Sequence, residues 1–267
     1  MIVDGKSIKD KLINFYKEEI INNDYKIKLA IVSVGLDEPT QIYIRNKAKV
    51  CEEAGISYEL YHYDDIKEYE LKDLIISLNN NDDITGIIVE LPLPKEFNKE
   101  EILNLIDPKK DVDGLSQCST ITPCTAQAVL YILNDNNISL INKKVTLIGY
   151  SNLIGKPLAK YFIDNNIDVT ICNTKTIDLK ASTINADVII TAAGVSNLVT
   201  CDMVKDGAVI IDCGITRDSN NKLSGDVDFD SVKDKTTLIT PVPNGVGPVT
   251  TVMVVKNLID LYKARFL

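Results

Sequence analysis

A tyrosine and a lysine four residues apart, Tyr43 and Lys47, are the first side chains in the chain whose types and spacing could do chemistry together. Asp37 to Pro39 is typical of a first helical turn, and Ala54-Gly55 is a typical helix stop. A helix between them places Tyr43 and Lys47 on one mainly apolar face, which is completed by Val50, Cys51 and Ala54. An ammonium group there is costly unless a partner pairs with it. The alternative, a lysine that extends along the edge of this face into solvent, stays open from the helix alone.

Two aspartates, Asp111 and Asp113, flank a valine just before Gly114. In an extended backbone their side chains point to opposite sides, so we expect at most one of them to face a ligand. A carboxylate there suits a ligand edge with two neighbouring N–H donors, by the geometry that pairs carboxylates with guanidinium groups. A turn in which an aspartate binds the backbone before the glycine is the alternative, and both interpretations stay open.

A candidate phosphate-binding loop follows the apolar run at 143–149. Gly149 ends a predicted strand, and Ser151 and Gly155 precede a predicted helix. Such a turn would offer the first amides of the helix to a phosphate group. The spacing is G-x-S-x-x-x-G rather than G-x-G-x-x-G, so an ordinary strand-turn-helix stays open as the alternative.

The predicted strand after this loop ends in Asn173, Thr174 and Lys175 rather than in the acid that commonly binds the ribose of NAD. Asn173 and Thr174 could hydrogen-bond a ribose or a 2′-phosphate. Further on, the segment 240–250 holds three prolines and two glycines, which is typical either of a linker or of a rigid loop that presents backbone groups to a ligand.

The scaffold that must position these residues reads as an α/β fold. Apolar runs at 28–35 and 83–90 alternate with helical segments, which is the pattern of a parallel sheet covered by helices. A second series of strands follows at 143–149, 168–172, 186–192, 208–212 and 238–240, before a long helix at 249–266. We therefore predict two domains: an N-terminal parallel-sheet α/β domain of residues 1–120 plus 250–267, and a Rossmann-type dinucleotide-binding domain of residues 121–249.

Composition narrows the classes of function. The formal charge of −9 on 267 residues disfavours nucleic acid as a partner. Six scattered cysteines form no C-x-x-C pair, and with a single histidine they predict no metal site. The chain shows no signal peptide, and no apolar run reaches the roughly 18 residues that a membrane span needs, so we expect a cytoplasmic protein without a membrane partner.

Together the motifs resemble those of the bifunctional methylenetetrahydrofolate dehydrogenase/methenyltetrahydrofolate cyclohydrolase family, nearly from end to end. The family shows Y-x-x-x-K, V-Q-L-P-L-P, K-D-V-D-G, P-C-T-P, G-R-S-x-x-V-G-x-P, D-x-G-I and P-V-P-G-G-V-G-P-M-T. The chain has, in the same order, Tyr43 to Lys47, VELPLP from Val89, KDVDG from Lys110, PCTA from Pro123, GYSNLIGKP from Gly149, DCGI from Asp212 and PVPNGVGPVT from Pro241.

The resemblance implies two domains around a cleft, with folate bound by the first domain and a nicotinamide cofactor by the second. It also implies oxidation of 5,10-methylenetetrahydrofolate with NAD(P)⁺ and hydrolysis of the methenyl product to 10-formyltetrahydrofolate, by a homodimer formed through the cofactor domain. It implies a catalytic group of Lys47, Tyr43, Glu90 and Asp113. It implies substrate binding by Tyr43, Leu91, Pro92, Asp113, Pro241 and Gly245. It implies cofactor binding by Gly149, Tyr150, Ser151, Gly155, Asn173, Thr174 and Ile215. A lysine in an apolar face agrees with this, because desolvation can lower its pKa toward working pH.

Among the positions that depart from the family pattern, three bear on the lysine and on the choice of cofactor. Glu90 stands where the family has glutamine, and an ionised Glu90 close to Lys47 would favour the protonated lysine and oppose its use as a base. Retention of only one of the two activities therefore stays open, as do a non-catalytic folate- or nucleotide-binding protein and another two-domain dehydrogenase. Tyr150 replaces an arginine and Asn173 a histidine, which leaves the choice between NAD and NADP open, with NADP slightly favoured.

Overall fold

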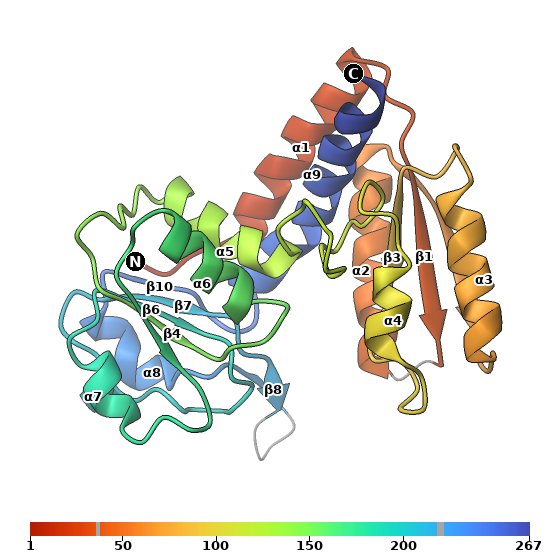
Figure 1. Cartoon of the computed structure of the whole chain (residues 1–267). Coiled ribbons are helices and arrows are strands. Elements are labelled where there is room, and N and C mark those ends of the chain that lie inside the picture. The colour runs from red at the N-terminus through yellow and green to blue at the C-terminus, as the bar shows by residue number, and fades with distance from the viewer. Residues whose placement is uncertain (36–37, 218–221) are drawn as a thin grey trace. The chain divides into compact units, whose positions relative to one another are not determined.

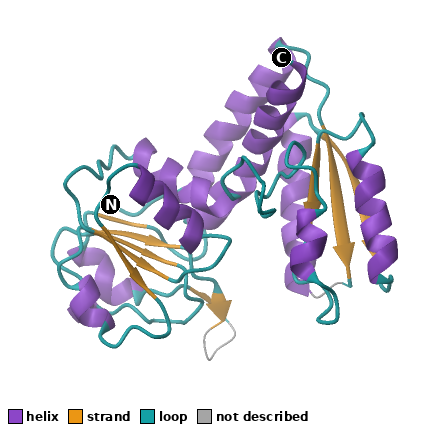
Figure 2. Ribbon diagram, viewed as in Figure 1, coloured by secondary structure: helices purple, strands orange, loops and turns teal. Residues whose placement is uncertain are grey.

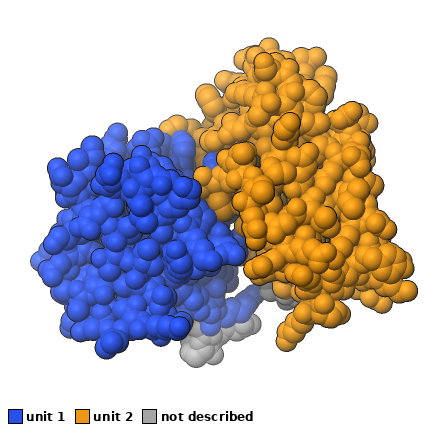
Figure 3. Space-filling view, viewed as in Figure 1, with its two compact units in different colours: residues 1–9, 125–250 blue, residues 10–124, 251–267 orange. Residues whose placement is uncertain are grey.

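The computed structural model describes residues 1–35, 38–217 and 222–267 and divides them into two compact units (Figure 3). Unit 1 comprises Met1–Lys9 and Thr125–Thr250, and unit 2 comprises Asp10–Cys124 and Thr251–Leu267. The predicted domains, 1–120 with 250–267 and 121–249, group the first nine residues differently. These residues belong to unit 1 because Val3 N donates to Ile239 O at 2.9 Å and Ile239 N donates to Met1 O at 3.0 Å.

Unit 2 is built on a three-stranded parallel sheet with the order β2-β1-β3 (Figure 1). Its strands are β1 (Lys28–Val34), β2 (Ser57–Tyr63) and β3 (Gly86–Val89), and its helices include α2 (Glu38–Ala54), α3 (Glu68–Asn79) and α4 (Lys99–Asn104). Helices α1 (Gly5–Asn22) and α9 (Val246–Phe266) contribute most of their residues to this unit.

One face of this sheet forms a buried apolar core. Ala30, Val32 and Val34 alternate along β1 and therefore share that face. They belong to one cluster with Ile75 of α3 and Ile102 of α4, both of which are fully buried. This packing fixes β1 and β3, whose carboxyl ends are where ligands bind in such sheets.

Unit 1 is built on a five-stranded parallel sheet with the order β10-β7-β6-β4-β5 (Figure 2). Its strands are β4 (Val145–Ile148), β5 (Val169–Cys172), β6 (Val188–Thr191), β7 (Val209–Asp212) and β10 (Leu238–Ile239). Figure 1 shows α5 (Cys124–Asp135) and α6 (Gly155–Asp164) on one side of the sheet, and α7 (Leu179–Thr183) and α8 (Phe229–Val232) on the other. The strand order reverses beside β4, so the crevice at its carboxyl end is the expected nucleotide site.

The observed elements follow the predicted pattern of helices and strands. Asp37, part of the predicted start of α2, lies outside the described residues. Short elements of unit 1 were not predicted: α7, α8, the antiparallel pair β8 (Thr216–Arg217) and β9 (Leu223–Ser224), and the 3₁₀ turns η1 (Cys201–Met203) and η2 (Lys233–Lys235). Among the described helices, none combines the length and the apolar character that crossing a membrane requires.

Candidate active site

Lys47 lies between two carboxylates in unit 2. Its Nζ atom is 2.9 Å from Glu90 Oε1 and 3.2 Å from Asp113 Oδ2. The exposed fractions of the three side chains are 14% for Lys47, 6% for Glu90 and 20% for Asp113. The charge that helix α2 places in an apolar face is therefore paired, as its burial requires.

Three separate elements bring this group together. Lys47 comes from α2, whose face toward the core is buried at Val50, Cys51 and Ala54. Glu90 follows β3, and its amide donates to Val32 O at 2.8 Å, which holds it at the carboxyl end of the sheet. The segment before Asp113 runs beside β3, where Val112 N donates to Ile87 O at 3.3 Å.

The two carboxylates determine the protonation of the lysine. Burial by itself lowers the pKa of Lys47, but the charges of Asp113 and Glu90 outweigh burial, so the pKa lies above its ordinary value. Desolvation alone would lower the pKa as expected, but the expected effect of an ionised Glu90 close to Lys47 prevails, and Asp113 adds to it. Burial also raises the pKa of Glu90, although the charge of Lys47 opposes that rise. The group therefore holds a protonated lysine beside a carboxylate that takes up a proton more readily than an exposed glutamate.

Asp111 and Asp113 have different roles. One aspartate forms the turn before Gly114, and the other presents its carboxylate at the site. Asp111 is fully buried and accepts hydrogen bonds from the amides of Gly114 at 2.9 Å, Leu115 at 3.3 Å and Ser116 at 2.9 Å. It forms the turn, while Asp113 faces Lys47. The expectation that at most one of the two faces the site is confirmed.

Two residues near the lysine were not found from the sequence. Cys124 Sγ lies 3.7 Å from Asp113 Oδ1, and Asn257 Nδ2 of α9 donates to Cys124 Sγ at 3.4 Å and to Val112 O at 2.8 Å. Both side chains are buried. The P-C-T motif was a signal for Cys124, but nothing in the local sequence points to Asn257.

The other predicted folate residues of unit 2 lie around this group. Tyr43 is 45% exposed, and burial raises the pKa of its hydroxyl while the nearby charge of Lys47 lowers it. Leu91 and Pro92 follow Glu90 directly and are joined by a cis peptide bond. Tyr43, Lys47, Glu90 and Asp113 are thus brought to one place within unit 2.

In the loop after β4, two glycines allow the backbone to pass close to neighbouring backbone. Gly149 has φ +102°, and a Cβ atom there would lie 2.4 Å from Ala192 O at the end of β6. A Cβ atom on Gly155 would lie 2.2 Å from Gly149 O. Ser151 Oγ accepts a hydrogen bond from Ile154 N at 3.3 Å, just before α6 begins. Since only glycine fits at both positions, the loop suits the pyrophosphate of a dinucleotide at the start of α6.

The end of β5 offers polar groups and a cation. Asn173 Oδ1 accepts from Lys175 N at 2.9 Å, and Asn173 N donates to Thr176 Oγ1 at 2.9 Å, which closes a tight turn. The side chains of Asn173, Thr174 and Lys175 are exposed. Tyr150 is also exposed, and Lys156 Nζ lies 5.8 Å from the centre of its ring.

The remaining predicted residues also belong to unit 1. Ile215 is 49% exposed and follows β7. In the loop before α9, a Cβ atom on Gly245 would lie 2.4 Å from Pro241 O, so this turn is tight. Asn244 stands where the family motif has glycine and adopts φ +76°, a left-handed conformation that asparagine tolerates better than most residues.

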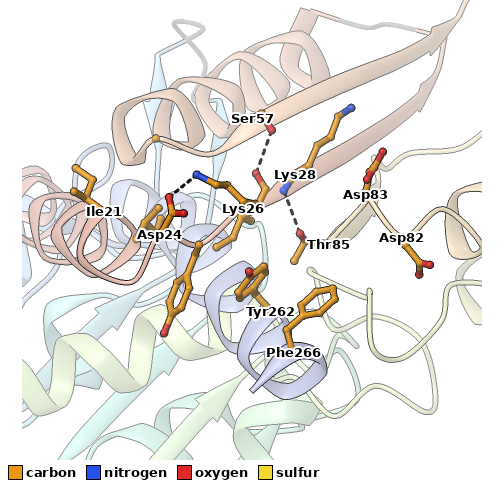
Figure 4. A pocket seen from close by; sticks show the side chains of 14 residues that line it. Ile21, Asp24, Lys26, Lys28, Ser57, Asp82, Asp83, Thr85, Tyr262 and Phe266 are labelled. Atoms are coloured by element: carbon orange, nitrogen blue, oxygen red, sulfur yellow. Dashed lines mark hydrogen bonds and ion pairs between the residues drawn. The ribbon is translucent and has the colours of Figure 1, made fainter.

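A hollow of about 650 Å³ lies at the amino ends of the strands of the unit 2 sheet, whereas Glu90 lies at their carboxyl ends (Figure 4). Lys28, the first residue of β1, and Thr85, just before β3, line it together with Tyr262 and Phe266 of α9. Because it adjoins the amino ends of the strands, it is separate from the Lys47 group. Within residues 1–35, 38–217 and 222–267, no three His, Cys, Asp or Glu side chains are placed to hold a metal ion.

A doubly wound sheet with a glycine-dependent loop after its first strand, and a second α/β unit with a buried lysine–carboxylate group, are features of two-domain α/β proteins that bind dinucleotides. Comparison with known proteins makes this specific. The model of the family described as tetrahydrofolate dehydrogenase/cyclohydrolase, catalytic domain, matches residues 3–113, and the model of its NAD(P)-binding domain matches residues 123–266. The chain belongs to the tetrahydrofolate dehydrogenase/cyclohydrolase family.

Individual relatives agree over the full length. The bifunctional protein FolD of Caldanaerobacter subterraneus subsp. tengcongensis is 42% identical and covers 98% of this chain and 97% of its own. The crystal structure of the bifunctional FolD of Campylobacter jejuni is 39% identical, with a TM-score of 0.95 and coverage of 100% of this chain and 99% of its own. The Trypanosoma brucei enzyme, complexed with NADP cofactor and an inhibitor, is 29% identical, with a TM-score of 0.93 and coverage of 99% and 98%. The predicted family and fold class are confirmed.

Proposed function

We propose that the protein oxidises 5,10-methylenetetrahydrofolate to the methenyl form with NAD(P)⁺ and hydrolyses the methenyl form to 10-formyltetrahydrofolate. One observation carries this proposal: Lys47 is held between Glu90 and Asp113 in the part of the chain that matches the catalytic domain of the family. An ammonium group fixed beside carboxylates can orient water and stabilise oxygen that gains negative charge, which is what hydrolysis of a methenyl bridge requires.

The folate site is proposed to comprise the residues around this group. The ring of Tyr43 packs against the folate, and Asp113 accepts N–H donors of the pterin edge. Asp113 suits this role because 20% of its side chain stays exposed while Lys47 and Cys124 hold its orientation. Leu91, Pro92, Pro241 and Gly245 complete the proposed substrate contacts.

The cofactor site is proposed at the loop after β4, with Gly149, Tyr150, Ser151 and Gly155, and at Asn173, Thr174 and Ile215. When bound, the nicotinamide ring accepts the hydride from the methylene carbon. The chain's own part is to bind the pyrophosphate at the amino end of α6 and the adenosine ribose at the end of β5.

NADP is the proposed cofactor in preference to NAD. The turn after β5 carries no carboxylate that would repel a 2′-phosphate, and Lys175 supplies an exposed cation there. The preference is tested by comparing kcat/KM for NADP⁺ and NAD⁺ in the wild type and in Lys175→Ala. Loss of the NADP⁺ preference in the variant supports this assignment, and an unchanged ratio contradicts it.

A homodimer in the cytoplasm, formed through the cofactor domain, is also proposed. Two points support it: all six cysteines are free, which suits a reducing compartment, and the resemblance to the family implies the dimer. Analytical ultracentrifugation tests the assembly, and a monomer at micromolar concentration would contradict it.

The activity is tested by three assays on the purified protein. Reduction of NADP⁺ and of NAD⁺ is followed with methylenetetrahydrofolate, and decay of methenyltetrahydrofolate is followed without cofactor. We expect turnover in the hydrolysis assay and in at least one oxidation assay. Binding of folate and nucleotide without turnover in any assay would instead establish a non-catalytic binding protein.

A further inference from the structure

We propose that Asp226 is a positioning residue of the cofactor site, which acts through the backbone of the loop after β6. The side chain of Asp226 is fully buried, so it fixes residues around the nucleotide without touching the nucleotide itself. This inference rests on the proposed function and adds a residue outside the loop after β4 and the turn after β5. It concerns only residues of unit 1.

The carboxylate of Asp226 accepts three hydrogen bonds from the end of β6 and the loop that follows. Oδ2 accepts from Thr191 Oγ1 at 2.7 Å and from Ala193 N at 2.6 Å, and Oδ1 accepts from Val195 N at 2.8 Å. Ala193 and Val195 are exposed residues, but their amides are bound to a buried acceptor. The path of this loop therefore depends on a side chain 33 and 31 positions further along the chain.

The loop after β6 packs directly against the glycine-dependent loop after β4. A Cβ atom on Gly149 would lie 2.4 Å from Ala192 O, 2.8 Å from Ala192 C and 3.3 Å from Ala193 N. The peptide group between Ala192 and Ala193 thus borders Gly149, and the N–H of the same peptide group donates to Asp226. Because the proposed pyrophosphate site needs Gly149 in its present conformation, a shift of this peptide group would disturb that site.

Asp226 also contacts the segment that follows β7 and carries Ile215. A Cβ atom on Gly214 would lie 2.2 Å from Asp226 Oδ1, so the carboxylate packs against the backbone of Gly214. The backbone of Asp226 is itself fixed, since its amide donates to Asp212 Oδ1 at 3.1 Å and its carbonyl accepts from Val199 N at 2.9 Å. One buried carboxylate thereby holds the loop beside Gly149 and the backbone next to Ile215.

Asp226→Asn tests this role, because the amide keeps the shape of the side chain but has one acceptor oxygen instead of two. Its NH₂ group must face at least one of the three donors, so at least one hydrogen bond is lost. We expect the dissociation constant of NADP⁺, measured by calorimetry well below the unfolding temperature, to rise at least about tenfold. The KM for NADP⁺ should rise with it, whereas the KM for methylenetetrahydrofolate should stay at the wild-type value.

Val232→Ala is the control for a general loss of stability. Val232 is fully buried on α8, which lies on the other side of the sheet from α6 (Figure 1). The substitution removes apolar packing but no hydrogen bond, so it should lower the unfolding temperature and leave the NADP⁺ affinity unchanged. An equal loss of affinity in Val232→Ala and Asp226→Asn would assign the effect to destabilisation and overturn the proposal. Wild-type affinity in folded Asp226→Asn would overturn it as well.

Amide hydrogen exchange of the wild type tests the same claim without a variant, and it decides the matter if Asp226→Asn does not fold. We expect the amides of Ala193 and Val195 to be protected in protein free of nucleotide, because Asp226 already holds them. Fast exchange of both amides without NADP⁺, with protection only in the complex, would show that the cofactor orders the loop and would overturn the proposal. Absence of nucleotide binding by the wild type would instead reject the proposed function, and this role with it.

Discussion

Asp226 donates its backbone amide to Asp212 Oδ1 at 3.1 Å, so one buried aspartate holds the backbone of the other. The amides of Gly214 at 2.8 Å and Val227 at 2.9 Å complete the acceptor set of Asp212. Asp226 in turn accepts from Ala193 N at 2.6 Å. The pair thereby ties together the segments after β6 and β7, next to the proposed cofactor site.

This pair predicts a pH dependence of stability. Burial raises the pKa of Asp212 to about 6, although the surrounding amides oppose the rise. The unfolded chain releases this proton near pH 4, so the native state binds more protons between about pH 4 and pH 6. The free energy of unfolding therefore falls as pH rises through that window, by roughly 3 kcal/mol in total.

Urea unfolding of the wild type and of Asp212→Asn should show a wild-type advantage in unfolding free energy that shrinks from pH 4 to pH 6. Asp206→Asn, at a position whose side chain is 92% exposed, should show a constant difference. A constant difference for Asp212→Asn would contradict the prediction.

Replacement of Lys47 by methionine leaves Glu90 and Asp113 without their common cation. We expect methenyl hydrolysis to fall by at least about 10²-fold, because the ammonium no longer stabilises oxygen charge. The loss of unfolding free energy should stay below about 3 kcal/mol, since Glu90 can take up a proton instead. Lys49→Met is the matched control, because that side chain lies on the same helix and is 67% exposed. Equal rates of hydrolysis in Lys47→Met and Lys49→Met would contradict the assignment of Lys47 to the active site.

Loss of the Cys124 thiol should weaken folate binding rather than abolish turnover. Cys124→Ala removes a thiol whose Sγ lies 3.7 Å from both Asp113 Oδ1 and Val112 O, and loss of a net hydrogen bond of up to about 1 kcal/mol to Asp113 corresponds to a rise in the folate KM of up to about fivefold. Cys124→Ser should recover part of this effect, since its hydroxyl is also a donor. Cys118→Ala, at an exposed cysteine, should match the wild type. The prediction fails if KM is unchanged in Cys124→Ala or if serine restores nothing.

Gly155 is expected to be indispensable for cofactor binding. An alanine there would place Cβ 2.2 Å from Gly149 O, so the loop after β4 must change shape. We expect Gly155→Ala to lose at least about tenfold in NADP⁺ affinity by calorimetry, which corresponds to about 1.4 kcal/mol. Gly247→Ala is the control, because its Cβ meets nothing within 4 Å. Wild-type affinity in Gly155→Ala would show that the nucleotide binds elsewhere.

Much of the fold could be predicted because hydrophobic periodicity and turn residues are local signals. The alternation of β1, α2, β2 and α3 was visible in this way, as was the glycine of the loop after β4. The short pair β8 and β9 was not, because two-residue strands carry no periodic pattern.

The candidate site was predictable only in part. The local sequence placed Lys47 in an apolar face and Asp113 before a turn, but their 3.2 Å contact joins residues 66 positions apart. Nor did any local pattern indicate that Asn257 donates to Val112 O, 145 positions away. Whether desolvation or a nearby Glu90 decides the pKa of Lys47 could not be settled from the sequence either, because it depends on tertiary contacts with Glu90 and Asp113.

The protonation of Lys47 is the most direct test of how the site works. In protein carrying ¹³C- and ¹⁵N-labelled lysine, the Nζ and Cε resonances of Lys47 can be assigned by their absence from Lys47→Arg and followed through a pH titration. We expect an ammonium group throughout the range from pH 6 to above pH 10, because Glu90 and Asp113 raise its pKa. A Lys47 that becomes neutral near pH 7 or 8 would contradict this and would restore the lysine as the base of the reaction.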